Sequence, residues 1–350
     1  MIFFLVLAIA AAYQLFAIVA CLMFRFQPPG ARGRSVAILK PVAGVGGNLR
    51  EALQAHAKLD AELYCGVRSL DDPAVPILRE SPKVRIVECP TATPNAKVGV
   101  LIDLLKASSS EIVIINDSDI CVPPDYLERV TAPLADPKVG LVTCLYRAVG
   151  DTFAARFEAL GVVTDFAPST LVARLVGVDE FAMGSTLAFR RADVSRIGGF
   201  ESFADYIADD YQLGHRIHAL GLKCVLADTI VETHLGGGFK DVWQHQVRWA
   251  RTIRVSKFWG YLGLPVTFAT FWALVCPNWH IGLAILAARM LMAVTAGLFK
   301  MRSTEVLKLF CLIPVRDLFG AAVWVAGLFG NTVVWRGRKL HLDPEGRIVE

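Results

Sequence analysis

The stretch EIVIINDSDICVP, residues 111–123, decides the fold that the sequence predicts. Within it, residues 112–115 are four β-branched apolar residues, which is typical of a strand buried on both faces of a parallel sheet. The run stops abruptly, and two carboxylates, Asp117 and Asp119, follow it. Because open α/β sheets bind ligands at the carboxyl ends of their strands, this stretch predicts a binding site there.

Asp117 and Asp119 lie two residues apart, so that their oxygens can converge on one divalent cation. Mg²⁺ and Mn²⁺ prefer carboxylate oxygens and often share their coordination shell with substrate phosphates. The two residues are therefore candidate ligands of a metal ion that holds a diphosphate. The alternative is an ordinary turn that caps the next helix, since Asp and Ser are favoured there as well.

The composition indicates a globular domain combined with membrane segments. Of the 350 residues, 54% are hydrophobic and 19% are charged, and the mean hydropathy is +0.48. This hydropathy is high for a soluble enzyme, and this charge is high for a bundle of membrane helices alone. The formal net charge of +4 does not suggest a nucleic-acid partner, and basic residues beside apolar segments suit an anionic membrane surface better.

An apolar run at the N-terminus predicts a membrane anchor. Residues 1–24 are long enough to cross a bilayer and lack the basic start of a signal peptide, so we expect an uncleaved transmembrane segment. Residues 25–34 form a linker rich in Pro, Gly and Arg. Its basic residues predict that the following domain lies in the cytoplasm.

A second apolar region, residues 259–335, lies near the C-terminus. Its first part predicts a transmembrane hairpin, with apolar runs on both sides of a Pro-Asn pair. Its second part contains Arg316 and Asp317, which predict a broken, re-entrant or interfacial hairpin in which these two charges can pair. Residues 336–350 are then expected to be a cytoplasmic tail.

Between these regions, residues 35–237 alternate between strand and helix patterns, which predicts βαβ units and a Rossmann-like α/β domain with a mostly parallel sheet. Expected strands cover residues 35–39, 64–67, 84–87, 112–115, 140–144 and 183–189. Expected helices cover residues 48–58, 98–105, 125–134 and 206–220. Acidic residues follow two of these strands, and this repetition favours a binding site over turn chemistry.

Two helices near the end of this domain carry further candidate residues. The helix expected from residue 206 begins with Asp209 and Asp210, which either cap it or supply a general base. Residues 238–258 mix aromatic and basic side chains on an amphipathic pattern. This pattern predicts a helix in the plane of the membrane interface, with an ordinary surface helix as the alternative.

Five motifs, in order and suitably spaced, resemble those of the ceramide-glucosyltransferase-like membrane glycosyltransferases, a branch of the large inverting family with the GT-A fold. The motifs are Lys40-Pro41, Asp72 within DDPA, Asp117 within DS, Asp210 within YIADD, and His245-Gln246-Val247-Arg248-Trp249 in place of the family's (Gln/Arg)xxArgTrp. The resemblance covers nearly the whole chain. It implies a GT-A catalytic domain held by N-terminal and C-terminal membrane helices.

The resemblance also implies a UDP-sugar donor and the residues that bind it. Asp72 would contact the uracil or ribose, and Asp117 and Asp119 would hold Mg²⁺ or Mn²⁺ on the diphosphate. The other residues implied on the donor side are Lys40, Lys97 and His245.

The catalytic residues implied by the resemblance are Asp210, Arg248 and Trp249. Asp210 would be the general base that deprotonates the acceptor hydroxyl. Arg248 and Trp249 would close over the diphosphate and the acceptor, where the metal and the arginine stabilise the negative charge of the leaving group. A single displacement of this kind inverts the anomeric carbon.

The implied activity is transfer of glucose or N-acetylglucosamine to a hydroxyl of a membrane lipid. His245, Asp119 and residues 164–169 depart from the pattern of animal ceramide enzymes. These departures favour the bacterial branch that acts in hopanoid biosynthesis, so that the implied acceptor is a hopanoid polyol, slightly ahead of ceramide, at the cytoplasmic face of the bacterial inner membrane. The alternatives are diacylglycerol or a growing polysaccharide as acceptor, transfer of a phosphosugar, and a non-catalytic membrane scaffold.

Overall fold

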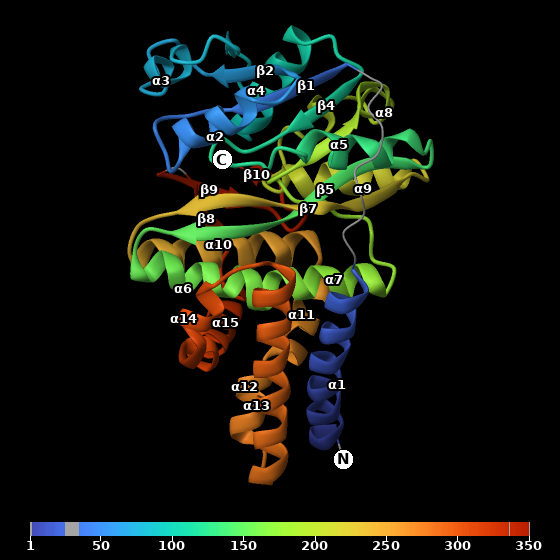
Figure 1. Ribbon diagram of the computed structural model, residues 1–350, viewed down its shortest axis with the longest axis vertical. Helices are drawn as coiled ribbons and strands as arrows, with labels where there is room; N and C mark the ends of the chain where they lie inside the picture. The colour runs from blue at the N-terminus through green and yellow to red at the C-terminus, as the bar shows by residue number, and fades with distance from the viewer. Residues whose placement is uncertain (1, 25–34, 336, 350) are drawn as a thin grey trace.

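The computed structural model describes residues 2–24, 35–335 and 337–349, and the predicted linker over residues 25–34 lies outside them. A sheet with the strand order β3-β2-β1-β4-β6-β5-β7 forms the centre of the α/β domain (Figure 1). Its strands are β1 (Val36–Pro41), β2 (Glu62–Val67), β3 (Val84–Glu88), β4 (Ile112–Ile115), β5 (Val139–Gly150), β6 (Leu187–Arg190) and β7 (Lys223–Leu235).

The sheet is mostly parallel, as the sequence predicts. Strands β1 to β4 pair in parallel, and so do β5 and β7, whereas β6 runs antiparallel to both β4 and β5. All four residues of β4 are buried, which confirms the predicted central strand over residues 112–115. Val113 and Ile115 face one hydrophobic core, whereas Ile112 and Ile114 face another on the opposite side.

Helices cover both faces of the sheet and complete a three-layer domain. One core packs α2 (Leu49–Ala57), α3 (Val75–Arg79) and α5 (Tyr126–Thr131) against the sheet. The other packs α4 (Ala96–Ala107), α8 (Arg191–Arg196) and α9 (Asp209–Ala219). The short helical turns η1 (Ala132–Ala135) and η3 (Phe200–Phe203) join these elements.

The longest strands, β5 and β7, were underestimated from the sequence. Strand β5 continues six residues beyond the predicted end at residue 144, and β7 was not predicted at all. The sequence of β7, KCVLADTIVETHL, places charged and polar side chains among the apolar ones, and most of its residues are only partly buried. Its pairing with β5 over most of its length holds it in the sheet.

A layer of helices lies below β5 and β7 (Figure 1). This helical layer consists of α6 (Phe153–Gly161), the π-helical turn η2 (Val162–Phe166), α7 (Ala167–Leu175) and α10 (Phe239–Ser256). Helix α10 coincides with the predicted amphipathic helix. The apolar helices project from the other side of this layer, so that it separates them from the sheet (Figure 1).

Within the described residues, three helices are long and apolar enough to cross a membrane, and a bent pair would make a fourth. The three cover Phe4–Met23, Trp279–Lys300 and Phe310–Gly327. The elements that form this region are α1 (Ile2–Met23), α11 (Phe258–Gly263), η4 (Leu264–Thr267), α12 (Ala269–Val275), α13 (Trp279–Val294), η5 (Thr295–Lys300), α14 (Glu305–Lys308), η6 (Phe310–Leu312) and α15 (Ile313–Gly327).

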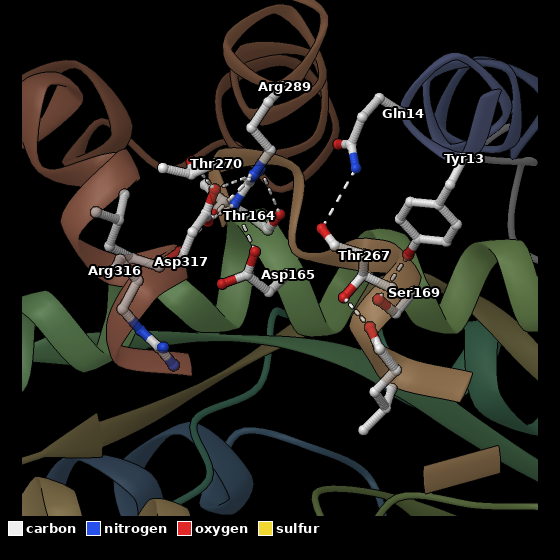
Figure 2. A network of polar contacts seen from close by, with 12 residues as sticks. Tyr13, Gln14, Thr164, Asp165, Ser169, Thr267, Thr270, Arg289, Arg316 and Asp317 are labelled. Atoms are coloured by element: carbon white, nitrogen blue, oxygen red, sulfur yellow. Dashed lines mark hydrogen bonds and ion pairs between the residues drawn. The ribbon is translucent and has the colours of Figure 1, made fainter. Parts of the chain in front are cut away.

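The first arm of the predicted hairpin is a bent pair of helices, Phe258–Thr267 and Ala269–Val275, which meet at an angle of 56°. Two expectations about the region after it need correction. The region containing Arg316 is a continuous helix with Pro314 in its first turn, where proline is tolerated. Asp317 does not pair with Arg316; it forms an ion pair with Arg289 of α13 (Figure 2). Arg316 donates instead to Gln246 of α10.

The C-terminal residues form a small antiparallel sheet against the α/β domain. Its strands are β8 (Thr332–Trp335), β9 (Arg338–Leu342) and β10 (Ile348–Val349). Val333, Leu340 and Leu342 pack with Ile207, just before α9. The Ile207 amide also donates to the Gly346 carbonyl, so the segment expected to be a tail is a folded part of the domain.

Candidate active site

A cavity of about 680 Å³ lies at the carboxyl ends of β1 and β4. Its walls come from the loops after these strands, the segment before β6, the N-terminus of α9, the helical layer and the hairpin of β8 and β9, called the C-terminal hairpin below. The cavity brings together seven of the nine residues that the sequence predicts for the site: Lys97, Asp117, Asp119, Asp210, His245, Arg248 and Trp249.

Lys97 stands at the centre of the polar end of the cavity. Its Nζ lies 2.9 Å from Asp117 Oδ1 and 3.0 Å from Asp209 Oδ2. Asn95 fixes this position, because its side chain caps α4 by accepting from the Lys97 amide. Burial alone would lower the pKa of Lys97, but the surrounding carboxylates of Asp117, Asp209 and Asp210 raise it, so the side chain stays charged.

Asp210 lies at the start of α9, where the helix dipole favours a carboxylate. Its Oδ2 accepts from the Gly184 amide at 2.9 Å, and its Oδ1 accepts from the Tyr211 amide at 2.8 Å. Burial, and secondly the neighbouring charge of Asp209, raise the pKa of Asp210 to about 6. A carboxyl group with this pKa, held by two backbone amides in a cavity, suits general-base chemistry near neutral pH.

Gly184 leaves room for the facing groups of the site. A Cβ at this position would lie 3.3 Å from Asp117 Oδ2, 3.4 Å from Asp210 Oδ2 and 3.5 Å from Lys97 Nζ. These three side chains, from three different parts of the chain, therefore surround one small space at Gly184. Sequence reasoning missed Gly184, since the spacing of the acidic motifs does not identify it.

Asp117 and Asp119 both line the cavity in the loop after β4. Asp119 accepts a hydrogen bond from the Thr233 hydroxyl of β7. The loop is anchored below by Asn116, whose side chain donates to the Tyr126 hydroxyl at 2.9 Å and to the Ser185 carbonyl at 2.7 Å.

These two carboxylates fit a hard divalent cation. Across the described ranges, no set of three or more His, Cys, Asp or Glu side chains gathers as a metal site. A cation on Asp117 and Asp119 would therefore take further ligands from a phosphate-bearing substrate, as Mg²⁺ commonly does. The charged amine of Lys97 already lies 2.9 Å from Asp117, which shows that this position accommodates positive charge.

Two predicted donor residues lie outside the cavity lining. Lys40 is fully buried and donates from Nζ to the Asp117 carbonyl at 2.9 Å, so it stabilises the loop after β4 from the interior of the domain. Burial lowers the pKa of Lys40 to about 8. Asp72 accepts from the Gly44 and Ala74 amides and thereby ties two loops together.

The helical layer forms the opposite wall through His245, Arg248 and Trp249 of α10. The rings of His245 and Trp249 lie 4.4 Å apart, and Trp249 contacts Phe166 of η2 at 6.2 Å between ring centroids. Burial lowers the pKa of Arg248, and the carboxylates of Asp117 and Asp210 oppose this effect. The cavity is thus polar at the sheet and lined by aromatic side chains at the helical layer.

The C-terminal hairpin contributes Trp335, Arg338 and Leu340 to the cavity. Sequence reasoning missed all three because the segment lacks any motif that relates it to the acidic clusters. The sequence offered Asp209 with Asp210 as a possible general base, and the resemblance selected only Asp210; in the structure Asp209 contacts Lys97.

Comparison with solved structures agrees with this architecture. The mannosyltransferase PcManGT from Pyrobaculum calidifontis, solved in complex with GDP-Man and Mn²⁺, superimposes with a TM-score of 0.55 at 20% identity, over 92% of this chain and 97% of that one. The chain therefore has a GT-A-like glycosyltransferase fold.

Comparison of sequences identifies the family. The chain matches glycosyl transferase family 21 over residues 2–348 and therefore belongs to this family. Ceramide glucosyltransferase 1 of Caenorhabditis elegans is 26% identical over 205 residues, which are 55% of this chain and 44% of that protein. Ceramide glucosyltransferase 3 of the same organism is 23% identical, over 90% of this chain and 74% of that protein.

Proposed function

We propose that this chain transfers a hexose, glucose or N-acetylglucosamine, from a UDP-sugar to a hydroxyl of a membrane lipid, with inversion and with a divalent metal. The observation that carries the proposal is the position of Asp117 and Asp210 on two sides of the space at Gly184. In this proposal, one carboxylate would hold the donor's diphosphate through a cation, and the other would accept a proton. The two relatives named as ceramide glucosyltransferases support a lipid acceptor.

The residues of the chain divide the reaction between them. The acceptor oxygen attacks the anomeric carbon, its proton passes to Asp210, and the bond from that carbon to the diphosphate oxygen breaks. Lys97 and Arg248 line the same cavity, where their positive charges would stabilise the negative charge of the departing diphosphate. A cation on Asp117 and Asp119 would supply further positive charge at the same oxygens.

The acceptor is proposed to be a hopanoid polyol or ceramide, reached from the membrane side. The cavity wall formed by the helical layer includes apolar side chains, among them Val162, Phe166 and Ile253. This layer lies where the apolar helices leave the α/β domain (Figure 1). A lipid whose chains remain in the bilayer can present its hydroxyl group at this wall without leaving the membrane.

For the membrane itself, we propose a multi-pass arrangement in the bacterial inner membrane with the α/β domain on the cytoplasmic side. The apolar helices project from one side of the domain, as a single bilayer requires (Figure 1). The basic residues of the segment after α1 favour the cytoplasmic orientation.

The experiment is a transfer assay with purified protein in detergent. Radiolabelled UDP-glucose, UDP-N-acetylglucosamine and GDP-mannose are each offered with ceramide, a hopanoid polyol and diacylglycerol, with and without EDTA. We expect label to enter the lipid phase from a UDP-sugar, and EDTA to abolish this transfer. Retention of all label in the aqueous phase by a folded protein that binds the donor would overturn the lipid acceptor.

A further inference from the structure

A buried carboxylate on α6 holds His245 in one orientation. Glu158 is 2% exposed, and its Oε1 accepts from His245 Nδ1 at 2.7 Å and from Gln246 Nε2 at 2.7 Å. Neither the acidic motifs nor the (Gln/Arg)xxArgTrp pattern includes Glu158. Its carboxylate is satisfied only by these two consecutive residues of α10, among the hydrogen bonds of the described residues.

The hydrogen bonds of Glu158 continue through Gln246 to α15, one of the apolar helices. Gln246 Oε1 accepts from Arg316 Nη2 of α15 at 2.9 Å. The guanidinium of Arg316 lies between the rings of Phe157 and Phe319, at 5.9 Å and 5.4 Å from their centroids. Arg316 is 5% exposed, so the end of this chain of contacts at α15 is shielded from water.

The hydrogen bond to Glu158 determines what His245 offers to the cavity. A neutral imidazole that donates from Nδ1 to a carboxylate carries an unprotonated Nε2, which accepts hydrogen bonds. Among the described residues, no protein group donates to this nitrogen, and the side chain lines the cavity with 27% of its surface exposed. Phosphate oxygens are themselves acceptors, so the matching ligand group is a hydroxyl or an N–H.

The position of the His245 ring favours the lipid acceptor over the sugar nucleotide as the substrate that it contacts. His245 packs on Trp249, which packs on Phe166, so it belongs to the aromatic wall of the helical layer. The diphosphate-binding carboxylates lie instead at the ends of the sheet strands. A hydroxyl-bearing headgroup that enters from the membrane side meets His245 at this wall.

We propose that His245 recognises the acceptor by accepting a hydrogen bond at Nε2 from a headgroup hydroxyl, and that Glu158 is the positioning residue that holds this nitrogen in place. This inference rests on the proposed lipid acceptor. It departs from the resemblance, which places His245 on the donor side.

Two substitutions of His245 separate the functions of its two nitrogens. In His245→Gln, the amide reaches the place of Nε2 and can still accept from the headgroup. In His245→Asn, the amide takes the place of Nδ1, where it keeps the contact with Glu158 but leaves the cavity without an acceptor. We expect the KM for the lipid to rise about five- to tenfold in the Asn variant and less in the Gln variant, with the KM for the donor unchanged in both.

Glu158→Gln tests the positioning role. A glutamine can donate to Nδ1 and so reverse the tautomer, and we expect the lipid KM to rise as in His245→Asn while the donor KM stays constant. Glu305→Gln is the matched control, because Glu305 pairs with Arg156 of the same helix α6 and does not line the cavity. It is expected to leave both KM values unchanged.

The outcomes distinguish this inference from the proposed function. A rise in donor KM with constant lipid KM in the His245 variants overturns the inference and returns His245 to the diphosphate. An unchanged lipid KM in Glu158→Gln, with normal thermal stability, overturns the positioning role. If the unsubstituted protein transfers sugar to none of the lipids, that result overturns the proposed lipid acceptor, and with it the inference that rests on it.

Discussion

Arg289 of α13 and Asp317 of α15 form a buried ion pair, in which Arg289 Nη2 lies 2.6 Å from Asp317 Oδ1 and Nε lies 3.0 Å from Oδ2 (Figure 2). The same guanidinium contacts Asp165 of the helical layer, and Thr270 of α12 donates to Asp317. Arg289 is fully buried, so its charge depends on these partners. The guanidinium of Arg289 therefore joins two apolar helices, α13 and α15, to the helical layer that forms one wall of the active-site cavity.

Arg289→Leu is expected to destabilise the protein strongly. Removing the cation leaves the buried carboxylate of Asp317 uncompensated, which typically costs about 3–5 kcal/mol. The expected result is a large fall in Tm of the detergent-solubilised protein, measured by intrinsic fluorescence during heating.

The double variant Arg289→Leu/Asp317→Leu is expected to be more stable than the sum of the single variants predicts, because residues in contact do not act additively. Arg50→Gln is the control, since Arg50 and Glu80 form an ion pair at the exposed surface. It should leave Tm unchanged. Additive losses in the double variant would show that the pair is not coupled.

Asp210→Asn is expected to lower kcat about 10²- to 10⁴-fold, because an amide cannot accept the proton of the acceptor hydroxyl. The donor KM should change little. Asp71→Asn is the control, since Asp71 is exposed and lies outside the cavity lining. Full turnover by the Asp210 variant would remove the general-base assignment.

The pH dependence follows from the raised pKa of Asp210. Because burial and Asp209 raise this pKa to about 6, the carboxylate forms only as the pH rises through that value, and kcat/KM is expected to increase across it. The sign for stability is opposite: the group's contribution is fully present below its ordinary value of 3.8 and is lost as the pH rises through about 6. A rate that falls over this interval would contradict the role of Asp210.

The sequence predicts the centre of the sheet and the polar end of the site because both depend on short, local signals. The apolar run over residues 112–115 is typical of a buried strand, and the carboxylates after it then lie at the ligand-binding edge. Seven of the nine predicted site residues line one cavity. Asp117 and Asp119 follow from this strand, whereas Lys97, His245, Arg248 and Trp249 were identified only through the resemblance.

The remaining parts depend on contacts between distant segments. Strand β7 carries alternating polar residues that have a place only beside β5, and the C-terminal hairpin is recognisable only from its packing on Ile207. The predicted ion pair between Arg316 and Asp317 was wrong because the real partner of Asp317 also lies in a distant segment. Its adjacent residue, Arg316, points to Gln246, whereas Arg289 approaches from another helix, 28 residues away.

Gly184→Ala is expected to reduce activity with little change in stability. The new methyl group would lie 3.3–3.5 Å from Asp117 Oδ2, Asp210 Oδ2 and Lys97 Nζ, and would occupy the space between them. Since small displacements at a reacting centre are costly, we expect kcat/KM to fall about 10²-fold. Gly263→Ala is the control, because a Cβ there meets nothing within 4 Å. Equal activity of both variants would show that Gly184 does not shape the site.

Arg338→Ala tests the contribution of the C-terminal hairpin to donor binding. Arg338 lines the cavity from β9, where its positive charge faces the same space as Asp117 and Arg248. Loss of this charge is expected to raise the KM for the nucleotide sugar about two- to tenfold, and the difference should shrink as salt is added, since exposed charges are screened. The adjacent Lys339→Ala is the matched control, because Lys339 is also exposed on β9 but does not line the cavity. If both variants weaken donor binding equally, the effect belongs to the charge of the surface as a whole, and the hairpin has no specific contact with the donor.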